Sequence, residues 1–202
     1  MKYILPWGLI LGRILSGPMI IYLARLPHDW VGPAVVVLIW IALIGDILDG
    51  IIARHLGVAT PLMRRADSIA DLLFWISVGT ATWFWNPEVY RPHLLWLRLA
   101  LLLEALTYVV SFLKFGKELA AHAYSGKLLG IAILLGFTTI WWTDNSILAV
   151  PVMLFFAYVS HFDRFGIAFF LPRWTPDTPS MFHAWRIKKG LPIRRHKLFH
   201  GE

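Results

Sequence analysis

The chain has 202 residues, of which 58% are hydrophobic and only 15% are charged, and its formal net charge is +7. Its mean hydropathy of +0.64 is too high for a water-soluble globule of this size, whose surface needs more polar side chains. A soluble enzyme, a nucleic-acid-binding module and a disordered tail are therefore poor interpretations. The absence of Cys excludes disulfides, thiolate metal sites and a Cys nucleophile.

Apolar runs long enough to cross a bilayer follow one another along the chain. A spanning helix needs about 20 residues, and the runs predict six: Ile4–Ala24, Val31–Ala53, Asp67–Trp85, Leu94–Phe115, Lys127–Trp142 and Ile147–Leu171. We interpret the first as a helix of the mature protein rather than a signal peptide, since Arg13 interrupts its apolar core and no A-x-A cleavage site follows. The spacings Gly8–Gly12 and Gly126–Gly130 predict close helix contacts. We therefore expect an all-α integral membrane protein, with a six-helix transmembrane catalytic domain over residues 1–172.

The distribution of Lys and Arg predicts the orientation of these helices. Basic residues gather after the second, fourth and sixth helices: Arg54, Arg64, Arg65, Lys114, Lys117, Lys127, Arg173, Arg186, Lys188, Lys189, Arg194, Arg195 and Lys197. The positive-inside rule then places both termini and the basic loops on the cytoplasmic side of the cell membrane. The opposite helix ends carry six Trp that would form an interfacial aromatic belt: Trp30, Trp83, Trp85, Trp96, Trp141 and Trp142.

Residues 173–202 are predicted to form a basic amphipathic cytoplasmic tail. The tail has seven Lys or Arg against two acidic residues. A helix is expected from Ser180 to Lys189, with Met181, Phe182 and Trp185 on one face, and we expect it to rest on anionic lipid head groups. Docking of its apolar face on the bundle is one alternative. Binding of an acceptor phosphate by the last basic residues is the other. Nucleic acid is not an expected partner.

Four carboxylates bracket the loop between the second and third helices. Asp46 and Asp49 are three residues apart, and Asp67 and Asp71 are four apart, so each pair shares a helix face. Because the two helices are antiparallel and joined by a short loop, these faces can meet at one membrane boundary. The carboxylates then need a cation. Arginines of the adjoining loop are one solution, and hard divalent cations, which Asp oxygens prefer, are the one that we favour.

The carboxylates belong to a longer pattern, D-x2-D-G-x2-A-R-x8-G-x3-D-x3-D. The chain matches it at Asp46, Asp49, Gly50, Ala53, Arg54, Asp67 and Asp71, and Met63 stands where the pattern has its second Gly. The match resembles the CDP-alcohol phosphotransferase family, integral membrane enzymes of phospholipid synthesis. Weaker similarities to that family lie in the first and fifth helices: Pro6, Arg13, Pro18 and Gly126-Lys127. The six-helix fold with cytoplasmic termini also agrees with this family.

The resemblance implies a reaction and its metal site. A phosphatidyl group would pass from a CDP-linked donor, usually CDP-diacylglycerol, to an acceptor alcohol, with release of CMP. Two divalent cations, Mg²⁺ or Mn²⁺, would be held by the four aspartates Asp46, Asp49, Asp67 and Asp71. Asp71 also matches the carboxylate proposed in the family as general base, so it would accept the proton of the acceptor alcohol.

Three residues of the motif would bind the nucleotide part of the donor. Gly50 and Ala53 are small and three residues apart, which would let a nucleotide lie close against the helix. Packing against another helix is the alternative for both. The guanidinium of Arg54 matches the geometry of a diphosphate. Met63 puts a side chain into space that the family leaves empty, so we expect the nucleoside contact to differ here.

The acceptor alcohol is not identified by the sequence. Glycerol 3-phosphate suits a basic pocket and is the first candidate, with inositol phosphate, serine or another phospholipid as alternatives. Arg13 should face the site, either to neutralise the carboxylates or to bind substrate. His161, Asp163 and Arg164 form either a neutralising pair or an acceptor site.

Two other functions involve aspartates in a membrane, an intramembrane Mg-dependent prenyltransferase and an Asp-lined cation transporter. The motifs of a prenyltransferase are spaced differently and lack the Gly-x2-Ala-Arg run. A transporter predicts carboxylates near the middle of the membrane on several helices, whereas these crowd one boundary. The sequence leaves a homodimer open.

Overall fold

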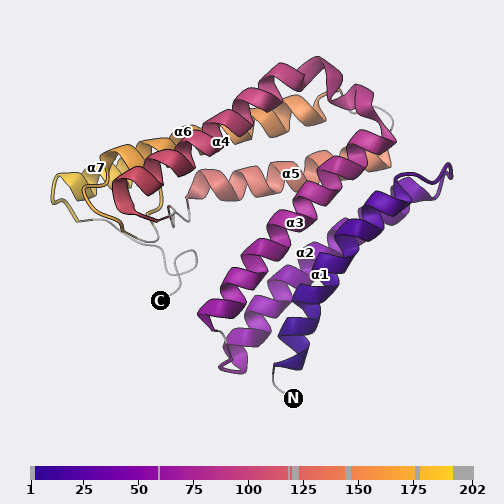
Figure 1. Cartoon of the computed structure of the whole chain (residues 1–202), viewed down its shortest axis with the longest axis horizontal. Coiled ribbons are helices and arrows are strands. Elements are labelled where there is room, and N and C mark those ends of the chain that lie inside the picture. Colours follow the sequence, from indigo (N-terminus) through magenta and orange to yellow (C-terminus); the bar gives the residue numbers. More distant parts are fainter. Residues whose placement is uncertain are drawn as a thin grey trace. The chain divides into compact units, whose positions relative to one another are not determined.

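The structure, a computed structural model, describes residues 3–58, 60–117, 119, 123–143, 147–175 and 178–192, without the side chains of Asp49, Arg54, Pro61 and Arg64. These residues form helices and no strand, which confirms the all-α prediction (Figure 1). The helices are α1 Ile4–Leu23, α2 Val31–His55, α3 Pro61–Trp85, α4 Leu94–Phe115, α5 Tyr124–Trp142, α6 Ala149–Phe170 and α7 Met181–Lys188. Two short 3-10 helices, η1 Pro87–Val89 and η2 Arg91–His93, precede α4.

Five helices of the described residues are long and apolar enough to cross a membrane, namely α1, α2, α4, α5 and α6. Such a set of helices indicates a membrane protein, as the composition predicted. The helix α3 has 25 residues but is less apolar than these five. Its first half carries the charged residues Arg64, Arg65, Asp67 and Asp71.

The helix ends agree with the predicted runs within three residues, except at the start of α3. That helix begins at Pro61, six residues before its apolar run. The hydroxyl oxygen of Thr60 caps it by accepting a hydrogen bond from the Met63 backbone N–H at 3.1 Å, and Pro61 occupies the first turn, where a missing N–H costs little. Because the cap lies in polar sequence, apolar runs alone do not reveal it. Asp67 and Asp71 consequently lie inside the helix rather than at its start.

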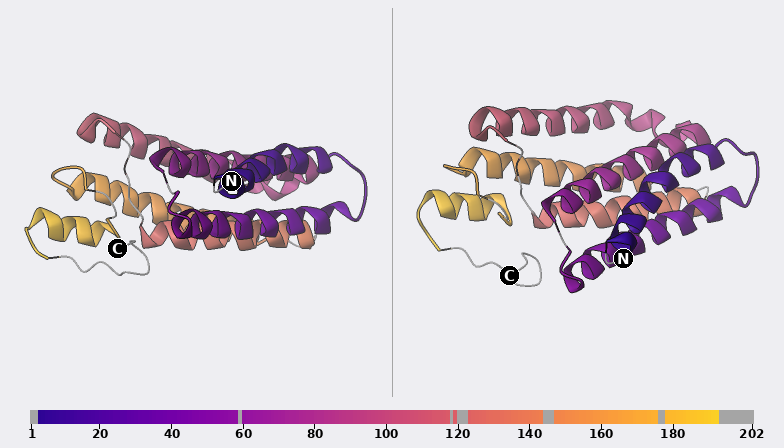
Figure 2. Two further views of the ribbon diagram at one scale, coloured as in Figure 1. Left: turned by 90° about the horizontal axis from the view of Figure 1, so that it is seen from below. Right: turned by 60° about the horizontal axis from the view of Figure 1, so that its bottom comes forward.

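The first of two compact units comprises residues up to Arg91 together with Phe137–Ser146. In it α1 packs against both α2 and α3 (Figure 2). The buried residues of α1 recur at helical spacing and form one face: Pro6, Ile10, Arg13, Gly17, Ile20 and Leu23. At Gly17 an added Cβ would lie 2.7 Å from the hydroxyl oxygen of Ser77, so α1 and α3 approach closely there. Arg13 is thus carried into the interior by a face that is otherwise apolar.

The C-terminal part of α5 also packs within this unit. Trp141 is 3% exposed, its indole N–H donates to the Thr82 hydroxyl oxygen at 2.9 Å, and its ring stacks on Trp85. The prediction that Trp141 belongs to an interfacial belt is therefore wrong, because its polar atom finds a partner inside the protein. Four of the other predicted belt residues are exposed: Trp30, Trp83, Trp96 and Trp142.

Two predicted small-residue contacts also differ from the structure. A Cβ added at Gly8, Gly12 or Gly130 would meet no neighbouring described atom within 4 Å, and one added at Gly126 would make only an ordinary contact with Ser160. The prediction of close helix contacts is therefore wrong at these positions. The spacing puts small residues on one helix face, but it does not specify that another helix covers that face.

The second unit contains α4, the first part of α5, α6 and α7. The helix α7 packs on α6 (Figure 2), and Ala184 of α7 is fully buried with Ile167 and Leu171. The backbone N–H of Met181 donates to the Asp163 carboxylate at 2.7 Å. The helix α7 thus docks on α6, but through Ala184 and Ile187, whereas Met181 and Phe182 of the predicted apolar face are 39% and 57% exposed. Lipid contact by its exposed face stays a prediction, and the basic residues after Pro192 lie outside the described part of the chain.

Candidate metal centre

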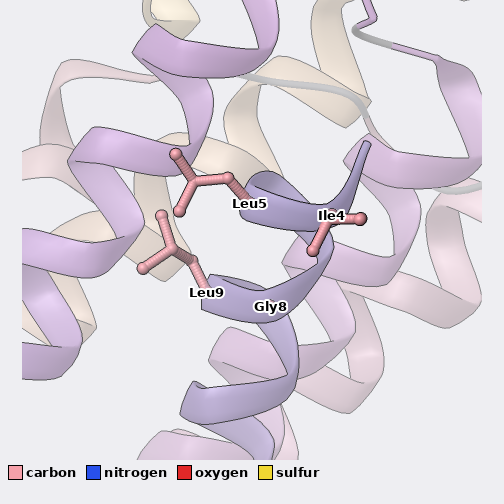
Figure 3. A pocket seen from close by; sticks show the side chains of 4 residues that line it. All are labelled: Ile4, Leu5, Gly8 and Leu9. Atoms are coloured by element: carbon pink, nitrogen blue, oxygen red, sulfur yellow. The ribbon is translucent and has the colours of Figure 1, made fainter. Parts of the chain in front are cut away.

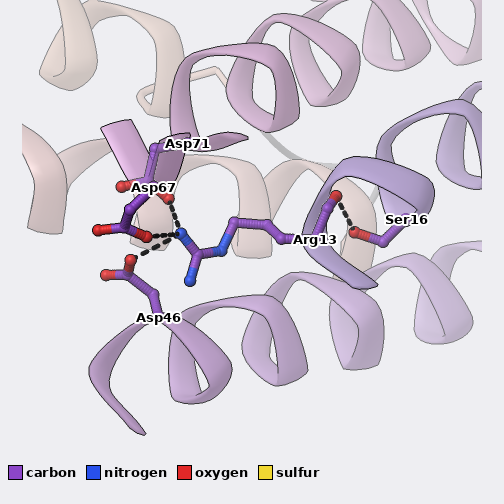
Figure 4. A network of polar contacts seen from close by, with 5 residues as sticks. All are labelled: Arg13, Ser16, Asp46, Asp67 and Asp71. Atoms are coloured by element: carbon purple, nitrogen blue, oxygen red, sulfur yellow. Dashed lines mark hydrogen bonds and ion pairs between the residues drawn. The ribbon is translucent and has the colours of Figure 1, made fainter. Parts of the chain in front are cut away.

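A single buried guanidinium lies among three carboxylates (Figure 4). One nitrogen of Arg13, Nη1, is 2.7 Å from Asp46 Oδ1, 2.8 Å from Asp67 Oδ1 and 2.6 Å from Asp71 Oδ1. The Arg13 side chain is only 2% exposed. Because Arg13 comes from α1, Asp46 from α2 and the other two from α3, this contact ties three helices together through charge.

The position of Arg13 explains how a charge is tolerated there. Arg13 lies on the buried face of α1, where an unpaired guanidinium would be strongly unfavourable. The three carboxylates compensate that charge with short, charge-assisted contacts. Of the two roles that the sequence allowed for Arg13, the geometry supports neutralisation of the carboxylates.

The carboxylates are also arranged so that a metal ion could be bound. One oxygen each from Asp46, Asp67 and Asp71 lie within 4.8 Å of one another. Their side chains are 32%, 32% and 40% exposed, so the oxygens can be reached from outside, whereas Arg13 is enclosed. Hard divalent cations prefer such oxygen donors. The donor set therefore fits a divalent cation of the Mg²⁺ or Mn²⁺ kind.

Three of the four predicted ligands are thus brought together. The expectation that the faces of α2 and α3 meet is confirmed for Asp46, Asp67 and Asp71. Asp49 follows Asp46 by one turn on α2, and its side chain lies outside the described part of the structure. The same holds for Arg54, the predicted partner of a diphosphate.

The contact of Arg13 with the carboxylates could be anticipated only in part. The signal for Arg13 in the sequence was a basic residue in the middle of an apolar helix.

Apolar side chains pack together near the end of α2 and the start of α3. Met63 is 4% exposed and Ala53 is 5% exposed, and both belong to a cluster with Ile10, Val58 and Ala70. The Met63 side chain therefore fills a space inside the protein. Gly50, one turn before Ala53, is partly exposed.

A second charged cluster lies between α4 and α6. Each carboxylate oxygen of Glu104 accepts a hydrogen bond from Arg164 Nη1 at 2.7 Å, and Oε2 lies 2.8 Å from His161 Nδ1. Asp163 instead accepts hydrogen bonds from the Ser125 hydroxyl and from the Met181 N–H. Of the two alternatives for these residues, the neutralising pair of Asp163 with Arg164 is therefore wrong, and the acceptor site stays a prediction. The partner Glu104 was missed because it lies far away in sequence, in the middle of an apolar run.

Comparison with known proteins identifies one family. The sequence model described as CDP-alcohol phosphatidyltransferase matches residues 3–169. This range contains both charged clusters and ends before α7. Comparisons with curated proteins and with solved structures find no match.

Proposed function

The chain belongs to the CDP-alcohol phosphatidyltransferase family, and we propose that it transfers the phosphatidyl group of CDP-diacylglycerol to an acceptor alcohol and releases CMP. Members of this family are transferases of substituted phosphate groups in phospholipid biosynthesis, and phosphatidyl transfer from a CDP-alcohol is what the family implies. The observation that carries the proposal is the convergence of Asp46, Asp67 and Asp71 from two helices. Glycerol 3-phosphate is the acceptor that we favour.

The family uses divalent metals, and the Asp triad can hold one. We propose that Asp46, Asp49, Asp67 and Asp71 together hold two, as Mg²⁺ or Mn²⁺. When bound, these ions would offset the charge of the phosphate oxygens and of the leaving CMP.

Asp71 is the proposed general base. Its side chain is the most exposed of the three described carboxylates, at 40%, so an acceptor hydroxyl can reach it. In the transfer, the acceptor oxygen forms a bond to the donor phosphorus and the bond from that phosphorus to CMP breaks. The hydroxyl proton passes to the Asp71 carboxylate, and CMP leaves with the electron pair. Arg13 holds Asp71 in place through its contact at 2.6 Å.

The motif residues of α2 are proposed to position the donor. Arg54 would pair with the diphosphate, since a guanidinium matches phosphate oxygens in geometry. Gly50 would let the nucleotide lie against α2, and its partial exposure supports this role. Ala53 is proposed to act with Gly50, since its small side chain would also let the nucleotide lie close against α2.

The proposed topology adds α3 as a sixth spanning helix. With an even number of spans, both termini, the site and the tail 173–202 lie on the cytoplasmic side of the cell membrane, as the Lys and Arg distribution favours. The charged first half of α3 then lies at the cytoplasmic boundary, where charges are tolerated better than at the membrane centre. Residues 1–172 form the catalytic domain.

The decisive assay incubates the purified protein with CDP-diacylglycerol, Mn²⁺ and a panel of acceptors, and follows CMP. We expect metal-dependent CMP release with at least one acceptor and none from the variant Asp46→Asn. Release of no CMP with any acceptor would contradict the proposal. Metal-dependent ion flux through liposomes containing the protein would then favour a cation transporter.

A further inference from the structure

A shallow apolar groove runs between α1 and α2. Its volume is about 310 Å³, within the range of small-molecule sites. The helix α1 lines it with Gly8, Gly12 and Met19, and α2 lines it with Leu38, Ala42 and Gly45. We refer to it as the α1–α2 groove.

A neighbouring depression of about 420 Å³ extends the groove toward the start of α1. Figure 3 shows the residues that line it, Ile4, Leu5, Gly8 and Leu9. Gly8 and Leu9 line both hollows, so the apolar surface is continuous along α1.

Two glycines keep the groove open. A Cβ added at Gly8 or Gly12 would meet no neighbouring atom of the described residues within 4 Å. These glycines therefore do not serve a close helix contact, in contrast to Gly17. Side chains at both positions would occupy the groove, and their absence leaves room for a ligand.

The walls of the groove offer almost no polar group to a ligand. The hydroxyl of Ser16, which lines the groove, donates to the backbone carbonyl of Arg13 at 2.8 Å. Leu15 and Ile41, at 61% and 59% exposed, turn apolar surface outward beside it. The chemistry of the walls thus selects a flexible apolar chain.

One end of the groove meets the candidate metal centre. Arg13 lines the groove and contacts Asp46, Asp67 and Asp71. Gly45, another lining residue, directly precedes Asp46. From Leu9, which lies beside Gly45, the groove extends along α1 to Met19, or about 15 Å at the helical rise of 1.5 Å per residue. It therefore leads away from the carboxylates, to the level of Met19 on α1 and Leu38 on α2.

We propose that the α1–α2 groove binds one acyl chain of the lipid donor. This inference rests on the proposed function, since a donor with its diphosphate at the aspartates must place its chains in the membrane beside them. The groove passes Asp46 at the level of Leu9 and Gly45, continues from there along α1 past Arg13 to Met19, and is apolar in its lining apart from Arg13 and Ser16. It thereby selects donors by chain length and keeps the head group in register with the carboxylates.

The direct test uses CDP-diacylglycerol that carries a photoreactive diazirine near the end of one acyl chain. The full-length protein in nanodiscs is irradiated with this probe, and the labelled peptides are mapped by mass spectrometry. We expect labels on the α1 and α2 residues that line the groove. Excess unlabelled CDP-diacylglycerol should suppress them, whereas phosphatidylcholine with the same chains should not. Equal suppression by both lipids, or labels spread over the other helices, would show ordinary bilayer lipid and overturn the inference.

A kinetic test compares Gly12→Leu with the matched control Gly130→Leu. Each substitution places Leu at a helical Gly whose added Cβ has open space, so neither should disturb packing. For a long-chain donor we expect Gly12→Leu to raise KM about tenfold, equivalent to about two CH₂ groups losing their burial. For a short-chain donor it should change KM less than about twofold, and Gly130→Leu should leave both values unchanged. Equal KM changes for both donors would contradict the groove assignment.

The two tests distinguish a wrong groove assignment from a wrong proposed function. If the wild type releases no CMP from either donor, the proposed function fails, and the labelling pattern alone then shows whether the lipid lies in the groove. If the wild type turns over both donors and Gly12→Leu leaves both KM values unchanged, the function stands and the groove inference is wrong.

Discussion

The two charged clusters of this protein differ in their balance of charge. Around Arg13, three described carboxylates face one guanidinium, which leaves an excess of two negative charges. Around Glu104, a single carboxylate faces the guanidinium of Arg164 and the imidazole of His161, so Arg164 alone neutralises it. The carboxylates of the first cluster outnumber its cation, so that cluster can accept a further cation, whereas the second is balanced by Arg164. Balance of charge thus distinguishes a candidate ion site from a contact that joins two helices.

The two clusters also differ in the exposed fraction of their side chains. The carboxylates around Arg13 are 32% to 40% exposed, whereas Glu104, Arg164 and His161 are 28%, 21% and 12% exposed. A balanced and more enclosed pair fastens α4 to α6. An unbalanced and accessible set keeps carboxylate oxygens available for a ligand.

The largest effect is expected from Asp46→Asn, which removes one proposed metal ligand. We expect kcat/KM for CMP release to fall about a thousandfold or more, comparable to removing a group that stabilises transition-state charge. The variant should still fold, because Arg13 keeps Asp67 and Asp71 as partners. CMP release measures the first effect, and size-exclusion chromatography of the purified variant measures the second. Near wild-type turnover would contradict the proposal that the Arg13 cluster, unlike the Glu104 cluster, takes part in the reaction.

Met63→Ala tests the packing beside the Arg13 cluster. Since Met63 is 4% exposed among apolar neighbours, truncation should lower the free energy of unfolding by about 2–4 kcal/mol. Met19→Ala is the matched control, because Met19 is 50% exposed and should cost little. Thermal unfolding followed by Trp fluorescence compares the two. Equal melting temperatures for both variants would mean that Met63 is not part of the core.

Arg13→Gln tests whether the guanidinium is the counter-ion of the three carboxylates. Loss of the guanidinium leaves three carboxylates facing one another, and we expect destabilisation by about 2 kcal/mol, less than for a fully buried pair because the carboxylates are partly exposed. Mn²⁺ should raise the melting temperature of this variant more than that of the wild type, because it replaces the lost charge. An equal Mn²⁺ shift in both proteins would contradict the role of Arg13 as counter-ion.

The smallest effect on turnover is expected from a substitution in the Glu104 cluster. Glu104→Gln should lower thermal stability, since it leaves Arg164 without its carboxylate, but should change kcat by less than about threefold. The double variant Glu104→Gln with Arg164→Met should recover part of the stability. Should Glu104→Gln abolish turnover with normal folding, the second cluster would belong to the reaction.

The helices were largely predictable from the sequence because apolar runs end where polar residues begin. The start of α3 was not, because Thr60 and Pro61 begin the helix inside polar sequence. The carboxylates of the site were predictable from the spacings of Asp46, Asp67 and Asp71, since helix geometry fixes which residues share a face.

The partners of buried charges could not be predicted in the same way. Whether Arg13 turns to the carboxylates, or Arg164 to Glu104 rather than to Asp163, depends on how each helix is rotated about its axis. Sequence spacing within one helix does not specify that rotation. For the same reason, the spacing of Gly8 and Gly12 did not distinguish a covered face from an open groove.

Asp163 has a consequence for the biogenesis of the protein. Its carboxylate accepts hydrogen bonds from the Ser125 hydroxyl on α5 and from the Met181 N–H on α7, each at 2.7 Å. The ribosome synthesises α5 and α6 before α7, so α7 can dock only after both earlier helices are in place. Docking of α7 is therefore a late step of assembly, and a chain with misplaced α5 or α6 leaves this amphipathic helix without the Asp163 contact that fixes its start.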